Sequence, residues 1–455
     1  MQKNEEYIVE CTSYTSEGLG VVRIDDFVFF VPNLIRGEVA KVGITAMKKS
    51  YGYARVIEII KPSPNRVEAK CPIHKMCGGC DLQIMNRDEQ NYLKSQKVRD
   101  AFLANAKIEV DLEPIIYSDK DYEYRNKVQV PVQYNDGKTC MGFYKRRSND
   151  IIEFDYCHIQ SPLSNEITKT IKHLISKLNI TNNIRHVLIK HAHRNNEVLV
   201  CLVVREYPFE GSKILKDELI KKYPEIKSLS VIVNRRSDNV ILDGKEILLA
   251  GKPYIEEELL GKKFLIHAKS FFQVNPYSTE LLYSKAIEYA GLTGKEVVVD
   301  MYCGTGTIGL LASEKAKKVY GIEIVSDAIK DAKENAKLNN VKNIDFYNMD
   351  AKEGASALLR SNIKVDVIIV DPPRKGLTKD TIDAMIKINP ERIVYVSCDP
   401  GTLARDINIL KEHYNIDLVQ PVDMFPQTPH VETVCCLYHQ KKDFISVPYE
   451  PKNVE

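Results

Sequence analysis

A cysteine and two acidic residues near the end of the chain stand where short apolar runs begin or end. Cys398 follows the run RIVYVS, Asp371 follows VDVIIV, and Glu432 opens the run ETVCCLY. These β-branched runs predict buried strands, and the prolines that come soon after Cys398 and Asp371 end them. A thiol can add to an electrophilic carbon while a neighbouring carboxylate moves a proton. A lone cysteine can also be a small buried hydrophobic residue, which is how the run ETVCCLY uses its two.

A glycine-rich turn, DMYCGTGTIG (300–309), follows another apolar run and formally matches GxGxxG. Such a turn brings the backbone close to a ligand at a helix N-terminus, and that ligand can be a dinucleotide or S-adenosylmethionine. Asp300 would repel a pyrophosphate but suits a cationic sulfonium ligand, and Glu323 at the next strand end can accept hydrogen bonds from ribose hydroxyls. Together with Asp350 these acids favour S-adenosylmethionine. The alternative is that Asp300 and Asp350 only cap helices.

Beside a methyl donor, the thiol of Cys398 and the carboxylate of Glu432 fit one particular reaction. C5 of uracil is too weak a nucleophile to take a methyl group unaided, but a thiolate that adds to C6 makes C5 enolate-like. A base then removes the C5 proton so that the thiol is eliminated. Arg374 follows Asp-Pro-Pro where amino-methylating enzymes have an aromatic residue, which argues against an amino nitrogen as acceptor. The alternatives are a methyltransferase acting on another base, a non-catalytic RNA-binding protein and a dinucleotide oxidoreductase.

The elements around these positions predict an α/β protein of two or three domains. From residue 275 onward, apolar strands alternate with helices, which predicts a doubly wound, mostly parallel sheet with its active site at the carboxyl ends of the strands. Residues 1–60 predict the short strands of a small closed barrel, and 61–67 a linker. A helix is expected from about 88 to 106, and a strand-rich region extends to about 265.

Composition limits the cellular setting and the kind of cysteine chemistry. The 455-residue chain has no apolar run long enough to span a membrane and no evident signal peptide, so we expect a cytoplasmic protein with no membrane partner. Its eleven cysteines then predict reduced thiols, metal ligation or catalysis rather than disulfides. The net charge of +2 says little about partners. Between residues 120 and 150, however, basic residues interleave with tyrosines, as a single-stranded RNA surface requires.

The motifs SFFQVN, DMYCGTGTIG, GIEI, DPPRKG, SCDP and PHVETV together resemble those of the RNA uracil-C5 methyltransferase family, which makes 5-methyluridine. The resemblance covers residues 270–436. It implies a Rossmann-like class I methyltransferase domain with Cys398 as the nucleophile and Glu432 as the base that removes the proton. It further implies that S-adenosylmethionine and the uracil are bound by Gln273, Tyr302, Glu323, Asp350 and Asp371.

Residues 1–61 are similar to a TRAM domain, an OB-like β-barrel used for RNA binding. Because the tRNA-modifying branch of the family is similar only in the catalytic part, the resemblance implies 23S ribosomal RNA as the substrate, with tRNA as the alternative. We expect three domains in a monomeric protein: the barrel (1–61), a β-rich central domain (68–265) and the methyltransferase domain (266–455). In related structures the helix near 90–110 packs on the catalytic domain, so we expect it there in space.

A cysteine-rich turn, CPIHKMCGGC, contains Cys71, Cys77 and Cys80, and Cys157 lies in DYCHIQ. Three cysteines within ten residues of a reduced protein predict ligation, and both zinc and an iron–sulfur cluster accept four thiolates. In a zinc site, a histidine of the same motifs could replace one thiolate. The spacing C-x5-C-x2-C with a distant fourth cysteine resembles the [4Fe–4S] site of the ribosomal RNA branch. It therefore implies a structural [4Fe–4S] cluster on Cys71, Cys77, Cys80 and Cys157.

Overall fold

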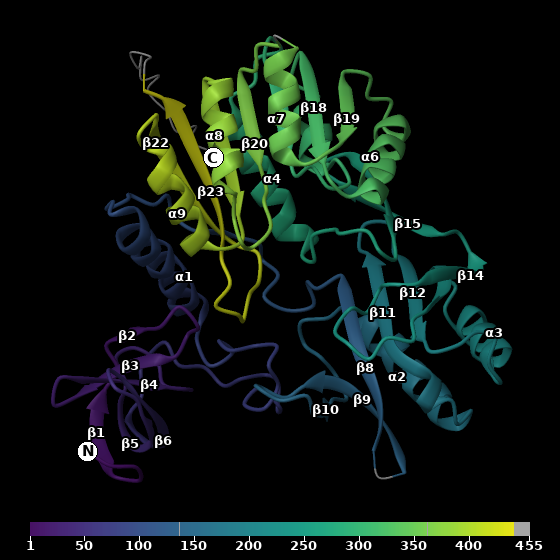
Figure 1. Cartoon of the computed structure of the whole chain (residues 1–455). Helices are drawn as coiled ribbons and strands as arrows, with labels where there is room; N and C mark the ends of the chain where they lie inside the picture. The colour runs from purple at the N-terminus through teal and green to yellow at the C-terminus, as the bar shows by residue number, and fades with distance from the viewer. Residues whose placement is uncertain (136, 362, 441–455) are drawn as a thin grey trace, which may run out of the picture.

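Four β-sheets organise residues 1–135, 137–361 and 363–440, which are the residues that the computed structural model describes (Figure 1). The N-terminal sheet has six strands in the order β1-β5-β6-β4-β3-β2. Because β1 also lies near β3, the sheet curls around a core that includes Phe29 and Val42. Its strands are β1 (Glu6–Glu10), β2 (Ser13–Tyr14), β3 (Gly20–Ile24), β4 (Phe27–Val31), β5 (Val39–Met47) and β6 (Gly52–Lys61).

The central sheet has seven strands in the order β10-β9-β8-β11-β12-β13-β14. Its middle strands β11 and β12 are buried at nearly every position because both of their faces are covered, and β12 is apolar at every position after Glu197. Helices α2 and α3 cover one face, and the hairpin β15–β16 lies against the other. The strands are β8 (Lys127–Asn135), β9 (Lys138–Tyr144), β10 (Ile151–Glu153), β11 (Ile184–Ala192), β12 (Glu197–Val204), β13 (Ile226–Val233), β14 (Lys245–Gly251), β15 (Tyr254–Leu259) and β16 (Lys262–His267). The helices are α2 (Pro162–Lys177), the short 3-10 helix η2 (Thr181–Asn183) and α3 (Ser212–Lys222).

The C-terminal sheet has eight strands in the order β19-β18-β17-β20-β21-β23-β22-β7. Apolar clusters bury both of its faces under helices, which confirms the predicted doubly wound α/β sheet. Its strands are β7 (Ile116–Tyr117), β17 (Val297–Met301), β18 (Lys318–Glu323), β19 (Ile344–Asn348), β20 (Val367–Val370), β21 (Arg392–Ser397), β22 (Tyr414–Asp423) and β23 (Glu432–His439). Its helices are α4 (Pro276–Ala290), α5 (Thr307–Ala312), α6 (Ser326–Leu338), α7 (Ala351–Arg360), α8 (Lys379–Ile388) and α9 (Pro400–Leu410).

Strand directions in the C-terminal sheet decide which loops can form a site. The five strands from β19 to β21 are parallel, and the chain order reverses between β17 and β20. Ligands of open α/β sheets bind beyond the carboxyl ends of the strands at such a switch point. β23 runs antiparallel to β21, so β23 begins at the edge where its parallel neighbours end. The loops after β17, β18, β20 and β21 therefore meet the start of β23.

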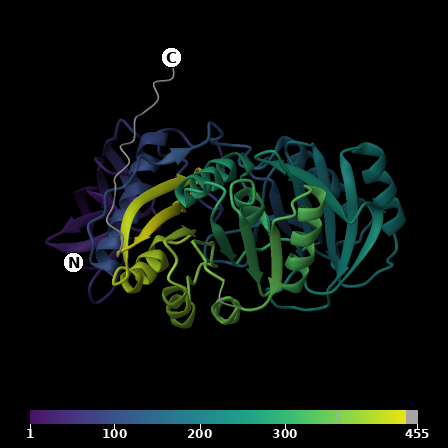
Figure 2. The ribbon, with the colours of Figure 1, turned by 90° about the horizontal axis from the view of Figure 1, so that it is seen from above.

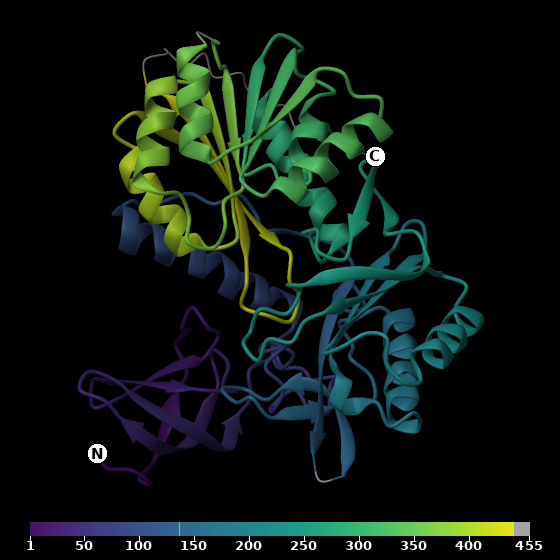
Figure 3. The same cartoon turned by 45° about the vertical axis from the view of Figure 1, so that its right-hand side comes forward.

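Helix α1 (Arg87–Ala101) joins the N-terminal sheet to the C-terminal sheet (Figure 3). It begins at Asn86, whose side chain accepts the backbone N–H of Glu89, and it continues into the π-helix η1 (Phe102–Ala106). Val98 and Phe102 lie in the same apolar cluster as β20 and β21. On the other side, the carboxylate of Glu89 accepts hydrogen bonds from Arg36 and from the hydroxyl of Tyr14. Viewed from above, the N-terminal and central sheets lie toward opposite ends of the molecule (Figure 2).

In the part of the chain that the structure describes, no helix has both the length and the apolar character that a bilayer crossing requires.

Candidate active site

The end of β21 and the start of β23 bring Cys398 and Glu432 together. Ser397 pairs with Thr433 across these antiparallel strands, so the residues just beyond that pair, Cys398 and Glu432, face the same edge. Asp371 follows β20, the next strand on the other side of β21. Glu432 and Asp371 both raise the pKa of the Cys398 thiol, and Asp371 raises that of Glu432, as expected for groups in close proximity. The structure therefore assembles the thiol and the two acids that the sequence singles out.

The Glu432 carboxyl is buried without a compensating partner. In residues 1–135, 137–361 and 363–440 its side chain makes no hydrogen bond or ion pair, and it is 3% exposed. Burial and, to a lesser extent, the charge of Asp371 raise its pKa to about 8, while Arg374 opposes the shift. Burial also raises the pKa of Asp371 to about 7. A carboxyl with a pKa near neutrality can accept and release a proton at little cost, which suits a general base.

Cys398 is half-buried beside these acids. Burial raises the pKa of its thiol to about 12, with further contributions from Glu432 and Asp371, while Arg374 lowers it. Arg374 is exposed at this rim and is the cation that favours both a thiolate at Cys398 and a carboxylate at Glu432. Sequence reasoning used Arg374 only against an amino acceptor. Its position directly after the two prolines was the signal that could have marked it as a site residue.

The glycine-rich turn after β17 leaves room for a ligand. Gly304 has φ of +54°, and no atom lies within 4 Å of the position that a Cβ would take there. Asp300 is fully buried beneath the turn, where its Oδ2 accepts the backbone N–H of Gly309 at 2.7 Å. Its Oδ1 is buried with no hydrogen-bond partner, and burial raises the pKa of the carboxyl to about 8. An unpaired acid beneath an open turn fits a cationic ligand with donor groups, as S-adenosylmethionine would be.

The residues that the resemblance implies for cofactor binding surround this turn. Glu323 accepts the backbone N–H groups of Gly304 at 3.2 Å and Val325 at 2.9 Å. Tyr302 has φ of +65°, and Glu323 and Asp350 both raise the pKa of its hydroxyl, although burial raises it more. Asp350 is exposed and accepts the backbone N–H of Lys352 at 2.9 Å, so it does cap α7.

Gln273 reaches the same region from the segment before α4. Its side chain is hydrogen-bonded to the hydroxyl of Tyr283, a fully buried residue of α4. Asp371, Glu432 and Asp300 all act on the ionisation of that hydroxyl, so Tyr283 lies among the three acids. The structure thus brings every candidate residue of the C-terminal sheet to one edge, with Asp350 at its solvent-exposed border.

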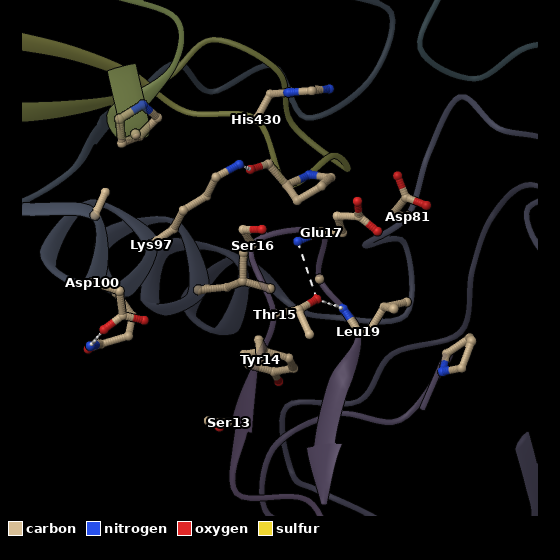
Figure 4. Close-up of a pocket in the computed structure, with 18 of the residues that line it drawn as sticks. Ser13, Tyr14, Thr15, Ser16, Glu17, Leu19, Asp81, Lys97, Asp100 and His430 are labelled. Carbon is tan, nitrogen blue, oxygen red and sulfur yellow. Dashed lines mark hydrogen bonds between the residues drawn. The ribbon is translucent and has the colours of Figure 1, made fainter. Parts of the chain in front are cut away.

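A cleft of about 1280 Å³ leads to this edge from the N-terminal sheet (Figure 4). Its walls come from the turn between β2 and β3, from α1 and from the cysteine-rich turn. Figure 4 shows Lys97 and His430 in this cleft, with Asp81 on one side. Asp399 and Pro400, which directly follow Cys398, also line it. The cleft therefore extends from three parts of the chain to the residues that directly follow the candidate nucleophile.

The four cysteines Cys71, Cys77, Cys80 and Cys157 gather at the junction between the central sheet and the cysteine-rich turn. A β-bridge joins Cys77 to Lys145. Burial and, to a lesser extent, the other three thiols raise the pKa of Cys80 to about 12. The number and the type of these donors, four cysteine thiols, fit a cluster with four thiolate ligands. Among the described residues, however, no group of three or more His, Cys, Asp or Glu side chains has an arrangement that could hold a metal ion.

Comparison with known proteins gives the family. A family model described as tRNA (uracil-5-)-methyltransferase matches residues 88–441. A protein of Clostridium tetani named "Uncharacterized RNA methyltransferase" is 43% identical over 453 residues, covering 97% of this chain and 98% of that protein. A relative of the same description from Halalkalibacterium halodurans is 40% identical over 447 residues and covers 96% of this chain and 98% of its own.

A solved structure extends the likeness to nearly the whole chain. The tRNA (uracil-54, C5)-methyltransferase of Pyrococcus abyssi in complex with S-adenosyl-L-homocysteine has a TM-score of 0.74 and 28% identity. The match covers 94% of this chain and 99% of that structure, so most of residues 1–61 lie within it. The premise that tRNA-modifying enzymes are similar only in the catalytic part is therefore wrong. Residues 1–61 alone do not distinguish a ribosomal RNA substrate from tRNA.

Proposed function

Because the chain belongs to the tRNA (uracil-5-)-methyltransferase family and is an S-adenosylmethionine-dependent RNA methyltransferase, we propose that it methylates C5 of uridine through a covalent adduct of Cys398. The observation that carries the proposal is the juxtaposition of Cys398 and Glu432 at the ends of paired strands. A methyltransferase acting on an amino nitrogen needs neither a thiol nor a second buried acid at this edge. A uracil-C5 methyltransferase needs both.

In the proposed reaction Cys398 gives its proton to solvent water and its Sγ adds to C6 of the uracil, which moves the C5–C6 π electrons toward C5. C5 then bonds to the methyl carbon as the bond from that carbon to sulfur breaks, leaving S-adenosylhomocysteine. Glu432 takes the remaining C5 proton, the C5–C6 double bond re-forms, and the bond between C6 and Sγ breaks to return the thiolate. Arg374 favours the charged forms of both residues through its positive charge.

Asp300 and the residues around it are proposed to hold the methyl donor. The free Oδ1 of Asp300 can accept a hydrogen bond from its amino group. Glu323 and Asp350 are suited to its ribose and purine, and Gln273, Tyr302 and Asp371 to the space between the donor and the uracil. The target base must leave its stack to reach Cys398, and the cleft along α1 suits the nucleotides beside it.

Covalent trapping tests the reaction. RNA containing 5-fluorouridine and methyl-labelled S-adenosylmethionine should give a labelled protein–RNA adduct, because fluorine cannot leave C5 as a proton does. Cys398→Ala should give none, while Cys201→Ala, which replaces a buried cysteine of β12 in the central sheet, should still form it. The covalent mechanism would be refuted if the wild type transferred label to ordinary RNA but formed no adduct with RNA containing 5-fluorouridine.

Ribosomal RNA and tRNA are the two candidate substrates. The similarity of residues 1–61 to a TRAM domain first suggested 23S ribosomal RNA, whereas the likeness to the Pyrococcus abyssi enzyme favours tRNA. Transcripts of 23S ribosomal RNA and of tRNA, offered in turn with labelled methyl donor, discriminate between them. Because the spacing of Cys71, Cys77 and Cys80 resembles that of the ribosomal RNA branch, we propose ribosomal RNA as the substrate. Exclusive labelling of tRNA would reverse this choice.

We also propose that Cys71, Cys77, Cys80 and Cys157 ligate a structural [4Fe–4S] cluster, since four thiols converge there from two segments. Protein purified without oxygen should contain about four iron and four sulfide per chain, and the cluster should be lost in Cys80→Ser. Cys140→Ser is the matched control, because this half-buried cysteine lies outside the group. One zinc per chain without sulfide would replace this proposal with a zinc site.

The domain division proposed for the chain is 1–61, 68–265 and 266–455, of which 441–455 lie outside the described residues. Helix α1 and strand β7 pack with the third domain although they precede it in the chain. We propose that the protein is a monomer of the cytoplasm. Light scattering at the elution peak should then give a mass near 51.9 kDa.

A further inference from the structure

The segment 424–431, which joins β22 to β23 and delivers Glu432 to the site, is held by residues from distant parts of the chain. In Figure 3 it projects beyond the end of the sheet toward the other two parts of the molecule. Five of its backbone carbonyls accept a hydrogen bond from outside the segment. The donors are Asn275 to Met424 O, Lys94 to Phe425 O, Tyr124 to Pro426 O, the backbone N–H groups of Asp81 and Leu82 to Gln427 O, and Lys97 to Pro429 O.

Gln427 is the point where this segment is most constrained. Its φ of +71° lies in the left-handed region, which a glutamine adopts only when its surroundings hold it there. Gln90 of α1 supplies that hold: its Oε1 accepts the Gln427 backbone N–H at 2.9 Å, and its Nε2 lies 3.2 Å from the Gln427 Oε1. Both side chains are buried, and Gln90 Nε2 also donates to Met85 O at 2.9 Å.

The segment has few internal contacts that could fix its shape without α1. Its own hydrogen bonds are local, such as the Thr428 hydroxyl to Phe425 O at 2.8 Å. Only four residues separate Gln427 from Glu432, and Glu432 has no side-chain hydrogen bond or ion pair of its own in the described ranges. The orientation of Glu432 therefore depends on where the segment enters β23.

We propose that Gln90 is a positioning residue for Glu432: its paired hydrogen bonds with Gln427 fix the segment that aims the Glu432 carboxylate at C5 of the substrate. The inference rests on the proposed function, in which Glu432 acts only after methyl transfer. Gln90 then affects proton removal and release of the thiol, and it leaves the addition of Cys398 to C6 unchanged. Helix α1 thereby becomes part of the catalytic apparatus without touching the substrate at this position.

The variant Gln90→Met distinguishes formation of the covalent adduct from the later removal of the C5 proton. With RNA containing 5-fluorouridine, which requires no proton removal, the variant should form the labelled adduct as fast as the wild type. With ordinary RNA it should turn over about tenfold to a hundredfold more slowly and accumulate the covalent adduct, since the slowed step follows its formation. Tyr124→Phe, which removes one donor to Pro426 O while keeping the ring, should do the same to a smaller extent.

Gln420→Met is the matched control. Gln420 is a buried glutamine of β22 whose Nε2 donates to Pro114 O at 2.6 Å and to Pro421 O at 2.9 Å, so its replacement also removes two buried hydrogen bonds. It should lower stability without accumulating the adduct. The inference would be overturned if Gln90→Met and Tyr124→Phe slowed adduct formation as much as they slowed product release. It would also be overturned if both variants turned over ordinary RNA at the normal rate. Absence of the adduct in the wild type would instead refute the proposed function.

Discussion

Two carboxylates at the two ends of the segment 424–431 have opposite surroundings. Asp423 closes β22 and is fully buried, with the ammonium of Lys94 at 2.5 Å and the guanidinium of Arg87 at 3.2 Å. Glu432 opens β23 and is also buried, but the charged group that affects its pKa most is another acid, Asp371. One hairpin thus carries an acid compensated by two cations and an acid with no buried cation.

This difference indicates that the buried carboxylate of Asp423 stabilises the structure, whereas that of Glu432 serves the reaction. Breaking a buried ion pair leaves an uncompensated charge, so Asp423 and Lys94 stabilise the junction of α1 with β22 only as long as both are present. An uncompensated acid such as Glu432 opposes folding once it is ionised, and its pKa rises until it can exchange a proton near neutral pH. Its retention at the strand edge is explained by reactivity rather than by stability.

The largest expected effect is on turnover at the uncompensated end. Glu432→Gln should lower the rate of 5-methyluridine release by about a thousandfold, since general base catalysis contributes on the order of 10² to 10⁴. On ordinary RNA the variant should accumulate the covalent adduct, measured as RNA-linked protein on a denaturing gel. Combining it with Cys398→Ala should remove that band. A Glu432→Gln enzyme with normal release would make Glu432 a structural residue like Asp423.

The same carboxylate-to-amide change at the compensated end should act on stability. Asp423→Asn leaves the ammonium of Lys94 buried without a counterion and should cost about 3–5 kcal/mol in the free energy of unfolding. Urea denaturation followed by fluorescence or circular dichroism measures this. Asp380→Asn breaks the exposed pair with Lys352 and should cost at most about 1 kcal/mol. Equal losses in the two variants would mean that the Asp423 pair is hydrated.

The sequence predicted the strand-end residues because a strand end can be recognised locally. An apolar β-branched run followed by Cys398 or by Asp371 and two prolines carries its own signal, and parallel strands bring such ends to one edge. The doubly wound sheet follows from the same alternation of strands and helices. The substrate RNA was not predictable in this way, because the N-terminal sheet is shared with a tRNA enzyme.

The positioning contacts were not predictable, because they join residues more than three hundred positions apart. Gln90 contacts Gln427 and Lys94 contacts Asp423 across the junction of α1 with the C-terminal sheet. A glutamine or lysine in a helix as polar as α1 is usually solvated, and nothing in the helix itself indicates a partner. Only the docking of α1 against β22 buries these side chains and makes their hydrogen bonds obligatory.

The raised pKa of Glu432 predicts how the release step depends on pH. Because its pKa lies at about 8, the ionised fraction should increase about tenfold per pH unit below that value and level off above it. The measurement is the decay of adduct preformed on ordinary RNA with Gln90→Met, after transfer to buffers of different pH. Arg374→Met removes a cation that lowers this pKa, so its profile should shift to higher pH. A rate independent of pH from about 6 to 8 would contradict this assignment.

Removing the uncompensated acid should also increase stability. The folded-state pKa of Glu432, about 8, lies above its ordinary value of 4.5, so the folded protein binds more protons than the unfolded chain between these values. Stability is therefore lost as pH rises through this range. Glu432→Gln should raise the free energy of unfolding by at most about 4 kcal/mol at pH 8 and by less than about 1 kcal/mol at about pH 5, whereas Asp423→Asn should lower it at both. Urea denaturation midpoints of the two variants at the two pH values measure these changes in stability.

A loss of stability in Glu432→Gln at the higher pH would mean that the charge of Glu432 is compensated after all. The two ends of the hairpin would then no longer differ.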